Sequence, residues 1–148
     1  MPGLTIQTVM RNEPFAYYAI KSVYDYADAI LLYDTGTSDQ LALDGIARLI
    51  KEDVKGKIRF ESLPIEDTTW MMTREIINSL GLIRQRQIND TKTEFFLVVD
   101  ADEVHYREGI RRIVEEILPN WPPNKAICHL PIRWHSQLQE IIGRIRAP

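Results

Sequence analysis

Residues 95–105 read FFLVVDADEVH, and this stretch decides what fold the chain is expected to adopt. The five leading apolar residues are typical of a short buried strand. Asp100 and Asp102 follow the strand directly, so the pattern places two carboxylates at the rim of a sheet. Carboxylates this close repel each other, and a divalent cation that takes oxygen ligands would relieve the repulsion. The alternative is a solvated turn in which Asp102 caps the next helix.

Other apolar runs of similar length recur along the chain and predict further strands. Residues 29–33, AILLY, form a continuous apolar run, whereas residues 57–63, KIRFESL, alternate between apolar and polar side chains. The strands expected from these patterns cover residues 4–10, 29–33, 57–63, 95–99 and 126–132.

Between the strands, apolar residues recur at the spacing of a helix face. Four helices are expected, and the third of them covers residues 70–90. The predicted inward-facing residues are Ala16, Ala19, Ile20 and Val23; Leu43, Ile46, Ala47 and Ile50; Ile76, Ile77, Leu80, Ile83, Gln87 and Ile88; and Ile110, Ile113, Val114, Ile117 and Leu118.

This alternation predicts an α/β fold with a mostly parallel sheet and helices on both of its faces. Sheets of this kind bind ligands at the carboxyl ends of their strands, where the strand order reverses. Polar segments follow three of the expected strands, namely residues 11–13 (RNE), 34–36 (DTG) and 100–102 (DAD). We therefore expect these three loops to converge on one crevice.

The composition narrows the class of protein. A length of 148 residues suits one domain, 1–148. The net charge of −3, with scattered Lys and Arg, argues against a nucleic-acid partner. No apolar run approaches the length of a membrane span, and the first residues do not resemble a signal peptide. With Cys128 as the single cysteine, these features favour a cytoplasmic protein.

Two further segments have both a structural and a functional interpretation. In residues 34–39, DTGTSD, Gly36 would permit an unusual backbone angle and Ser38 or Asp39 would cap the next helix. Alternatively, Asp34 would accept hydrogen bonds from the base or ribose of a ligand. Arg84, on the third helix, would face an anionic phosphate or simply be solvated.

Taken together, three segments resemble the nucleotide-sugar-binding half of family 2 glycosyltransferases with the GT-A fold. They are TVMRNE (8–13), YADAILLYDTGTSDQ (26–40) and RQRQINDTKTEFFLVVDADE (84–103), in the order of the family's motifs. Arg84 stands at the family's arginine, and Gln85 replaces the usual asparagine. The resemblance covers about residues 4–106. It implies a Rossmann-like GT-A three-layer sandwich with a mostly parallel central sheet, in which the acceptor half is short or missing.

The resemblance also implies a site for a UDP- or GDP-sugar donor with Mn²⁺ or Mg²⁺. The backbone of Val9 and the side chain of Arg11 would border the base, and Asp34 would contact the base or ribose. Thr35 stands where many relatives have a second aspartate. The implied nucleotide-sugar-binding residues are Val9, Arg11, Glu13, Asp34, Thr35, Arg84, Asp100 and Ala101, and the implied metal-binding residues are Asp100 and Asp102.

The implied activity is transfer of the sugar to an unknown acceptor. The family usually inverts the configuration at the anomeric carbon. Such a transferase needs a base for the acceptor hydroxyl, and none is assigned here. Only 46 residues follow Asp102, and Glu140 is the one acidic residue after Glu116, in a context that does not match the family. Whether the chain is an active enzyme therefore stays open.

Two other interpretations stay open. Residues 95–104 also fit the D-x-D-x-V motif of haloacid-dehalogenase phosphatases, with Asp100 as nucleophile and Asp102 as general acid/base. That class needs a later lysine and a later acidic pair, and this chain offers only Lys125. The other interpretation is a non-catalytic nucleotide-sugar-binding or assembly module, which would form a homo-oligomer.

Overall fold

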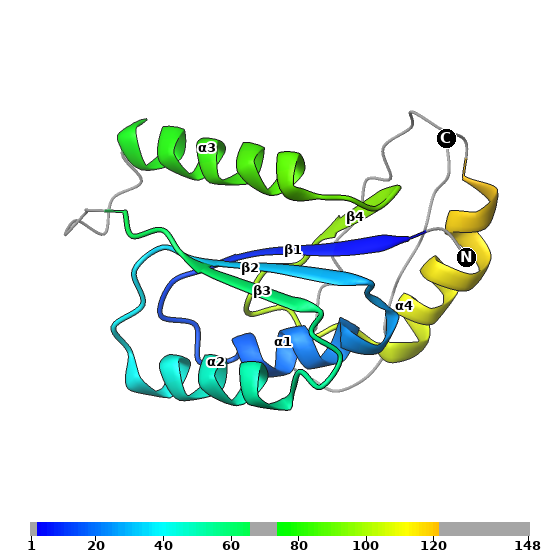
Figure 1. The fold of residues 1–148 in the computed structure, drawn as a ribbon, viewed down its shortest axis with the longest axis horizontal. Coiled ribbons are helices and arrows are strands. Elements are labelled where there is room, and N and C mark those ends of the chain that lie inside the picture. Colours follow the sequence, from blue (N-terminus) through cyan, green and yellow to red (C-terminus); the bar gives the residue numbers. More distant parts are fainter. Residues whose placement is uncertain (1–2, 66–73, 122–148) are drawn as a thin grey trace, which may run out of the picture.

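A four-stranded, all-parallel sheet forms the centre of the computed structural model, which describes residues 3–65 and 74–121 (Figure 1). The strand order is β3-β2-β1-β4, so the chain first adds strands on one side of β1 and then crosses to the other side. This reversal makes the edge between β1 and β4 the switch point of the sheet. The strands are β1 (Leu4–Met10), β2 (Ala29–Asp34), β3 (Ile58–Ser62) and β4 (Phe95–Val98).

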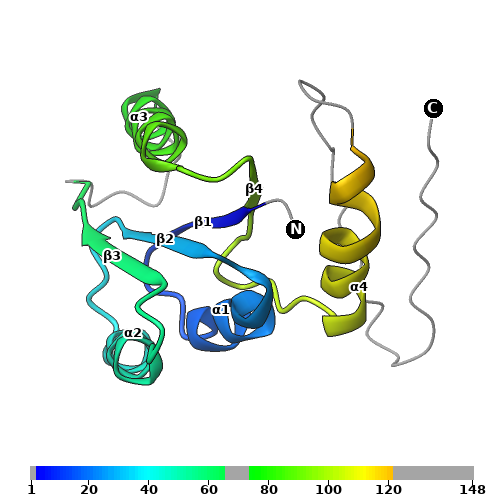
Figure 2. The same cartoon turned by 45° about the vertical axis from the view of Figure 1, so that its right-hand side comes forward.

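Helices cover both faces of this sheet (Figures 1 and 2). On one face lie α1 (Ala16–Val23) and α2 (Gln40–Glu52), and on the other lies α3 (Arg74–Asp90). After β4, α4 (Arg107–Arg112) continues into a π-helical turn (Ile113–Ile117) and a 3-10 turn (Leu118–Asn120). The chain is thus an α/β protein whose layers are consistent with a Rossmann-like three-layer sandwich, as predicted.

Two expectations concern other parts of the chain. The predicted strand at 126–132 and the start of the predicted helix at 70–73 lie outside the described residues. Among the helices that the structure describes, none is long and apolar enough to cross a membrane.

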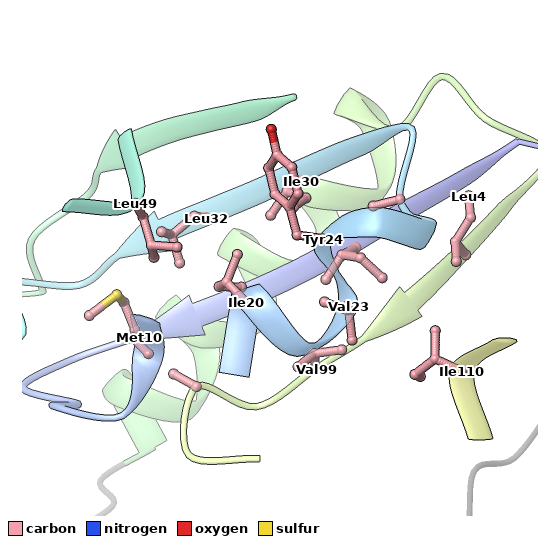
Figure 3. Packing of buried hydrophobic residues seen from close by; sticks show 14 of the residues in the cluster. Leu4, Met10, Ile20, Val23, Tyr24, Ile30, Leu32, Leu49, Val99 and Ile110 are labelled. Atoms are coloured by element: carbon pink, nitrogen blue, oxygen red, sulfur yellow. The ribbon is translucent and has the colours of Figure 1, made fainter. Parts of the chain in front are cut away.

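The larger part of the core lies between the sheet and the layer of α1 and α2 (Figure 3). Alternate residues of β1 and β2 point into it, because successive side chains of a strand face opposite sides. The predicted inner residues of α1 are all buried there. The helical segment after β4 contributes Ile110, Val114 and Leu118 to the same core, as predicted. The buried residues of this cluster are Leu4, Ile6, Met10, Ala16, Ile20, Val23, Tyr24, Ala27, Ile30, Leu32, Ala42, Ile46, Leu49, Val99, Ala101, Ile110, Val114 and Leu118.

The inner face predicted for α2 is wrong in three of its four residues. Leu43, Ala47 and Ile50 are exposed, and Ile46 is buried together with Ala42 and Leu49. The helix turns small residues toward α1: a Cβ added to Gly45 would lie 3.5 Å from the Cβ of Tyr17. The buried face of α2 is therefore rotated relative to the predicted one and still includes the large side chains of Ile46 and Leu49.

The face predicted for α3 is only partly right, since Ile83 and Gln87 are buried but Ile77 and Ile88 are exposed. The reason is that the contact of α3 with the sheet combines an apolar cluster around Ile83 with polar groups. Gln7 on β1, for example, donates from Nε2 to Oγ1 of Thr91, the residue that follows α3, at 2.8 Å. Apolar periodicity therefore does not describe the contact surface of this helix.

The prediction that residues 95–99 form a buried strand is only partly right. β4 ends at Val98, and its side chains alternate between half-buried and exposed. Phe96 and Val98 are 48% and 43% exposed, because they pair with Thr5 and Gln7 in register and so point to the α3 face. Among the described residues, β4 is an edge strand whose α3 face is not covered.

The orientation of α2 can be tested with two leucines on one helix. We expect Leu49→Ala to lower the free energy of unfolding by about 3 kcal/mol, because it leaves a cavity in the core. Leu43→Ala should cost clearly less, about 1 kcal/mol, since that side chain is 37% exposed and lies outside the core cluster. Urea unfolding of both variants measures the difference, and equal losses would contradict the orientation described here.

A second prediction concerns the hydroxyl of Thr8, which is fully buried and has no hydrogen-bond partner among the described residues. A buried hydroxyl without a partner costs free energy, so Thr8→Val should raise the free energy of unfolding by about 1 kcal/mol. Thr5 is the matched control, because its Oγ1 lies 2.7 Å from Oγ1 of Thr93. Thr5→Val should lower the free energy of unfolding by about 1 kcal/mol. Stabilisation by both substitutions, measured by urea unfolding, would contradict this assignment.

Candidate functional site at the carboxyl edge of the sheet

The loops after β1, β2 and β4 lie at one edge of the sheet, because these three strands are parallel neighbours (Figure 1). Asn12 joins the first two loops. It adopts a left-handed backbone conformation with φ of 54°. Its Oδ1 accepts hydrogen bonds from the backbone N–H groups of Ser38 at 2.7 Å and Asp39 at 3.0 Å. Asn12 belongs to the polar segment 11–13 that was expected at this edge, and a left-handed asparagine in a polar loop is a recurring turn device.

Asp34, at the end of β2, is 4% exposed and is occupied by its own loop. Its carboxylate accepts hydrogen bonds from the backbone N–H of Thr37 at 3.0 Å and from the hydroxyl of Thr37 at 2.5 Å. Ser62, at the end of β3, donates from Oγ to Asp34 at 3.3 Å. The carboxylate therefore shapes the loop that joins β2 to α2.

The two structural expectations for this loop are confirmed. Gly36 has a positive φ of 109°, a conformation that side chains with a Cβ rarely adopt. Asp39, rather than Ser38, caps α2 by accepting a hydrogen bond from the backbone N–H of Ala42 at 2.9 Å.

Three of the expected site residues face into the protein. Thr35 is buried and donates to the backbone oxygen of Met10 from both its N–H, at 2.9 Å, and its Oγ1, at 3.1 Å. Val9 is half-buried against Leu31, Tyr33 and Ile83 on the α3 side, and Ala101 belongs to the core on the α1 side. Only their backbone groups would be candidates for contact with a ligand. Arg11, by contrast, is exposed at the rim.

Arg84 reaches from α3 to the carboxyl end of β4. Its Nη2 lies 3.5 Å from Oδ1 of Asp100, a residue 16 positions later in the chain. The Arg84 side chain is 31% exposed, whereas that of Asp100 is 61% exposed. Burial lowers the pKa of Arg84, and the charge of Asp100 opposes this shift. The structure therefore brings two of the predicted site residues together as an ion pair at the switch point.

The charge of Asp102 acts on Glu13 across the same edge. Burial raises the pKa of Glu13, and the carboxylate of Asp102 raises it further. Asp102 itself is exposed. The two carboxylates thus lie within electrostatic reach, one after β1 and one after β4, and a cation bound between them would favour the charged form of both.

The described residues fit a metal ion that is shared with a ligand better than one held by protein alone. Within 3–65 and 74–121, no group of three His, Cys, Asp or Glu side chains is placed to hold a metal ion. Mg²⁺, however, usually takes one or two carboxylates and completes its shell with phosphate oxygens and water. The carboxylates of Asp102 and Glu13, which interact electrostatically, are ligands of this chemical type, whereas Asp100 is paired with Arg84.

No protein-family model matches the chain, and no curated protein matches it in sequence.

The coupling between Glu13 and Asp102 leads to a test that needs no ligand. We expect Asp102→Asn to move the pKa of Glu13 down toward its ordinary value of 4.5, with the part caused by burial remaining. A pH titration of the Glu13 carboxyl carbon by NMR measures the shift. Asp25→Asn is the control, because Asp25 pairs with Arg107 in a different ion pair.

The sign of the effect on stability follows from the same shift. A carboxyl group whose folded pKa is raised loses stabilising free energy as the pH rises through that pKa. Asp102→Asn relieves part of this loss, so at pH 7 the variant should be as stable as the wild type or slightly more stable. A clear loss of stability at pH 7, or an unchanged pKa of Glu13, would contradict the coupling.

Proposed function

We propose that the carboxyl edge of the sheet binds a nucleoside diphosphate sugar, UDP- or GDP-linked, together with Mn²⁺ or Mg²⁺, and that the protein is a glycosyltransferase of the GT-A type. The observation that carries this proposal is the Arg84–Asp100 ion pair at the switch point between β1 and β4. It supplies a cation for phosphate oxygens beside a carboxylate that can accept hydrogen bonds from ribose hydroxyls.

The neighbouring carboxylates support the same ligand class. Asp102 is exposed and acts electrostatically on Glu13, so this edge carries excess negative charge next to the ion pair. A diphosphate without a cation would be repelled by the carboxylates of Asp102 and Glu13. A diphosphate that brings Mn²⁺ or Mg²⁺ would satisfy them, because the ion takes oxygen ligands from both sides.

In this proposal the chain's own residues bind and orient the donor. Asp102, with Glu13 beside it, would hold the metal ion, which stabilises the charge on a leaving diphosphate as a Lewis acid. Arg84 would add positive charge near the same phosphates and keep Asp100 in place for the ribose. The backbone of residues 34–36 would border the base, since the side chains of Asp34 and Thr35 are already hydrogen bonded within the protein.

Calorimetric titration with UDP and GDP, each with and without Mn²⁺, tests the proposal. We expect one nucleotide to bind more tightly when Mn²⁺ is present. In Asp102→Asn, the increase in nucleotide affinity that Mn²⁺ causes should be at least about tenfold smaller, because an amide is a poor substitute for a carboxylate ligand. Asp25→Asn should bind like the wild type.

The outcomes separate the alternatives. If the wild type gives no heat and no melting shift with either nucleotide, with or without Mn²⁺, the nucleotide site is rejected. Hydrolysis of p-nitrophenyl phosphate that is lost in Asp100→Asn would favour the phosphatase. Nucleotide-sugar binding without turnover in the presence of varied acceptors would favour the non-catalytic module.

A further inference from the structure

Gln87, on α3, is fully buried between the helix and the sheet. Its Nε2 donates hydrogen bonds to the backbone oxygens of Thr8 on β1, at 2.9 Å, and of Leu31 on β2, at 3.1 Å. A long polar side chain is thus inserted over two neighbouring strands at the centre of the sheet. Burying an amide in this way requires that its groups find partners.

The partners determine which way the amide points. Carbonyl oxygens only accept hydrogen bonds, so the NH₂ group of Gln87 must face Thr8 and Leu31. A flipped amide would place Oε1 against two other oxygens, which is unfavourable in a buried site. The Oε1 atom is therefore left on the opposite side, where it accepts a hydrogen bond from Nη1 of Arg84 at 3.0 Å.

Arg84 is consequently held by groups whose positions the sheet determines. Besides Gln87, its Nη1 lies 3.4 Å from the backbone oxygen of Gln7 on β1. Its other terminal nitrogen, Nη2, is the one that meets Asp100. One side of the guanidinium group is bound to the protein, and the side toward the candidate site carries the ion pair.

We propose that Gln87 is a positioning residue for the donor site: its buried amide orients Arg84 so that the guanidinium group meets Asp100 and a bound diphosphate in one fixed geometry. This inference rests on the proposed function. A long side chain that is already oriented loses less conformational freedom when the ligand binds, and affinity gains from this.

A purely structural role is the competing explanation, since Gln87 also attaches α3 to the sheet. Other polar contacts attach the same helix without touching Arg84. The hydroxyl of Tyr33 on β2, for example, donates to Asp90 near the end of α3. Tyr33→Phe therefore weakens the attachment of α3 and leaves the Gln87–Arg84 hydrogen bond intact, which makes it a matched control for Gln87→Met.

The main experiment compares the affinities of these variants for UDP or GDP with Mn²⁺. Gln87→Met should weaken binding about tenfold, the loss expected when a charged group loses its hydrogen-bonding partner. Tyr33→Phe should stay within about twofold, as expected for a change away from the ligand. In an Arg84→Met background, Gln87→Met should have no further effect. Equal losses in Gln87→Met and Tyr33→Phe, or an undiminished Gln87→Met effect in the Arg84→Met background, would overturn the proposal.

A measurement without ligand keeps this inference separate from the proposed function. NMR can follow the rotation of each guanidinium group about its Cζ–Nε bond. In the wild type, the rotation of Arg84 should be slower than that of Arg112, whose side chain is 65% exposed. In Gln87→Met the rotation of Arg84 should become faster, and in Tyr33→Phe it should not change.

The two failures are then distinguishable. If the wild type binds no nucleotide, the proposed function fails, and the rotation rates still decide whether Gln87 orients Arg84. If Arg84 rotates as fast as Arg112 in the wild type, the positioning role is rejected, even if nucleotide binds. If Gln87→Met does not fold, the comparison in the wild type still tests the proposal, because rotation of Arg84 as fast as that of Arg112 would reject it.

Discussion

The parallel pairing of β1 with a neighbour on each side is the constraint on which the rest of this structure depends. β1 pairs with β2 from Thr5↔Ala29 to Met10↔Asp34, and with β4 from Leu4↔Phe95 to Gln7↔Val98. Because all three strands run the same way, the loops that follow them meet at one edge, although residues 11–13 and 100–102 are far apart in the chain. The Arg84–Asp100 pair depends on this arrangement, because the pairing of β4 with β1 sets where the end of β4 lies.

The two faces of the sheet are held by different kinds of interaction. Toward α1 and α2 the contact is apolar, and apolar packing depends mainly on shape and volume. Toward α3 it includes hydrogen bonds from Gln87 and Gln7, and these depend on direction as well as distance. Such hydrogen bonds fix both the rotation of the helix about its own axis and its position along the sheet. That suits a helix whose Arg84 must reach a particular carboxylate.

Much of the fold could be predicted from the sequence because apolar runs and turn residues mark the strands directly. The strands at 4–10 and 29–33 appear close to where they were expected, and so does the cap at Asp39. The inner faces of α2 and α3 were harder, because several turns of apolar spacing fit each helix and only one is buried. In α2 the buried set is Ala42, Ile46 and Leu49, with Gly45 close to Tyr17 on α1, and in α3 the predicted Ile77 and Ile88 are exposed. Only the neighbouring element explains such choices.

For the candidate site, sequence indicated the residues but not their partners. Arg84 and Asp100 were both expected there, and their ion pair is a consequence of strand order that no local pattern contains. Asn12 gave a weak signal as one polar residue among several, and its role depends on a left-handed backbone angle. The hydrogen bonds of Asp34 are likewise a property of its loop, because they come from Thr37 and from Ser62 on another strand.

The occupied carboxylate of Asp34 has a consequence for how substitutions at this edge are interpreted. Its oxygens hold Thr37 and Ser62, so replacing Asp34 would first release the turn that leads into α2. Loss of binding in such a variant would report the shape of the loop and not a contact made by the carboxylate. At the end of β2, a ligand would therefore contact backbone groups of the loop, and the buried carboxylate of Asp34 would act indirectly by fixing the conformation of that loop.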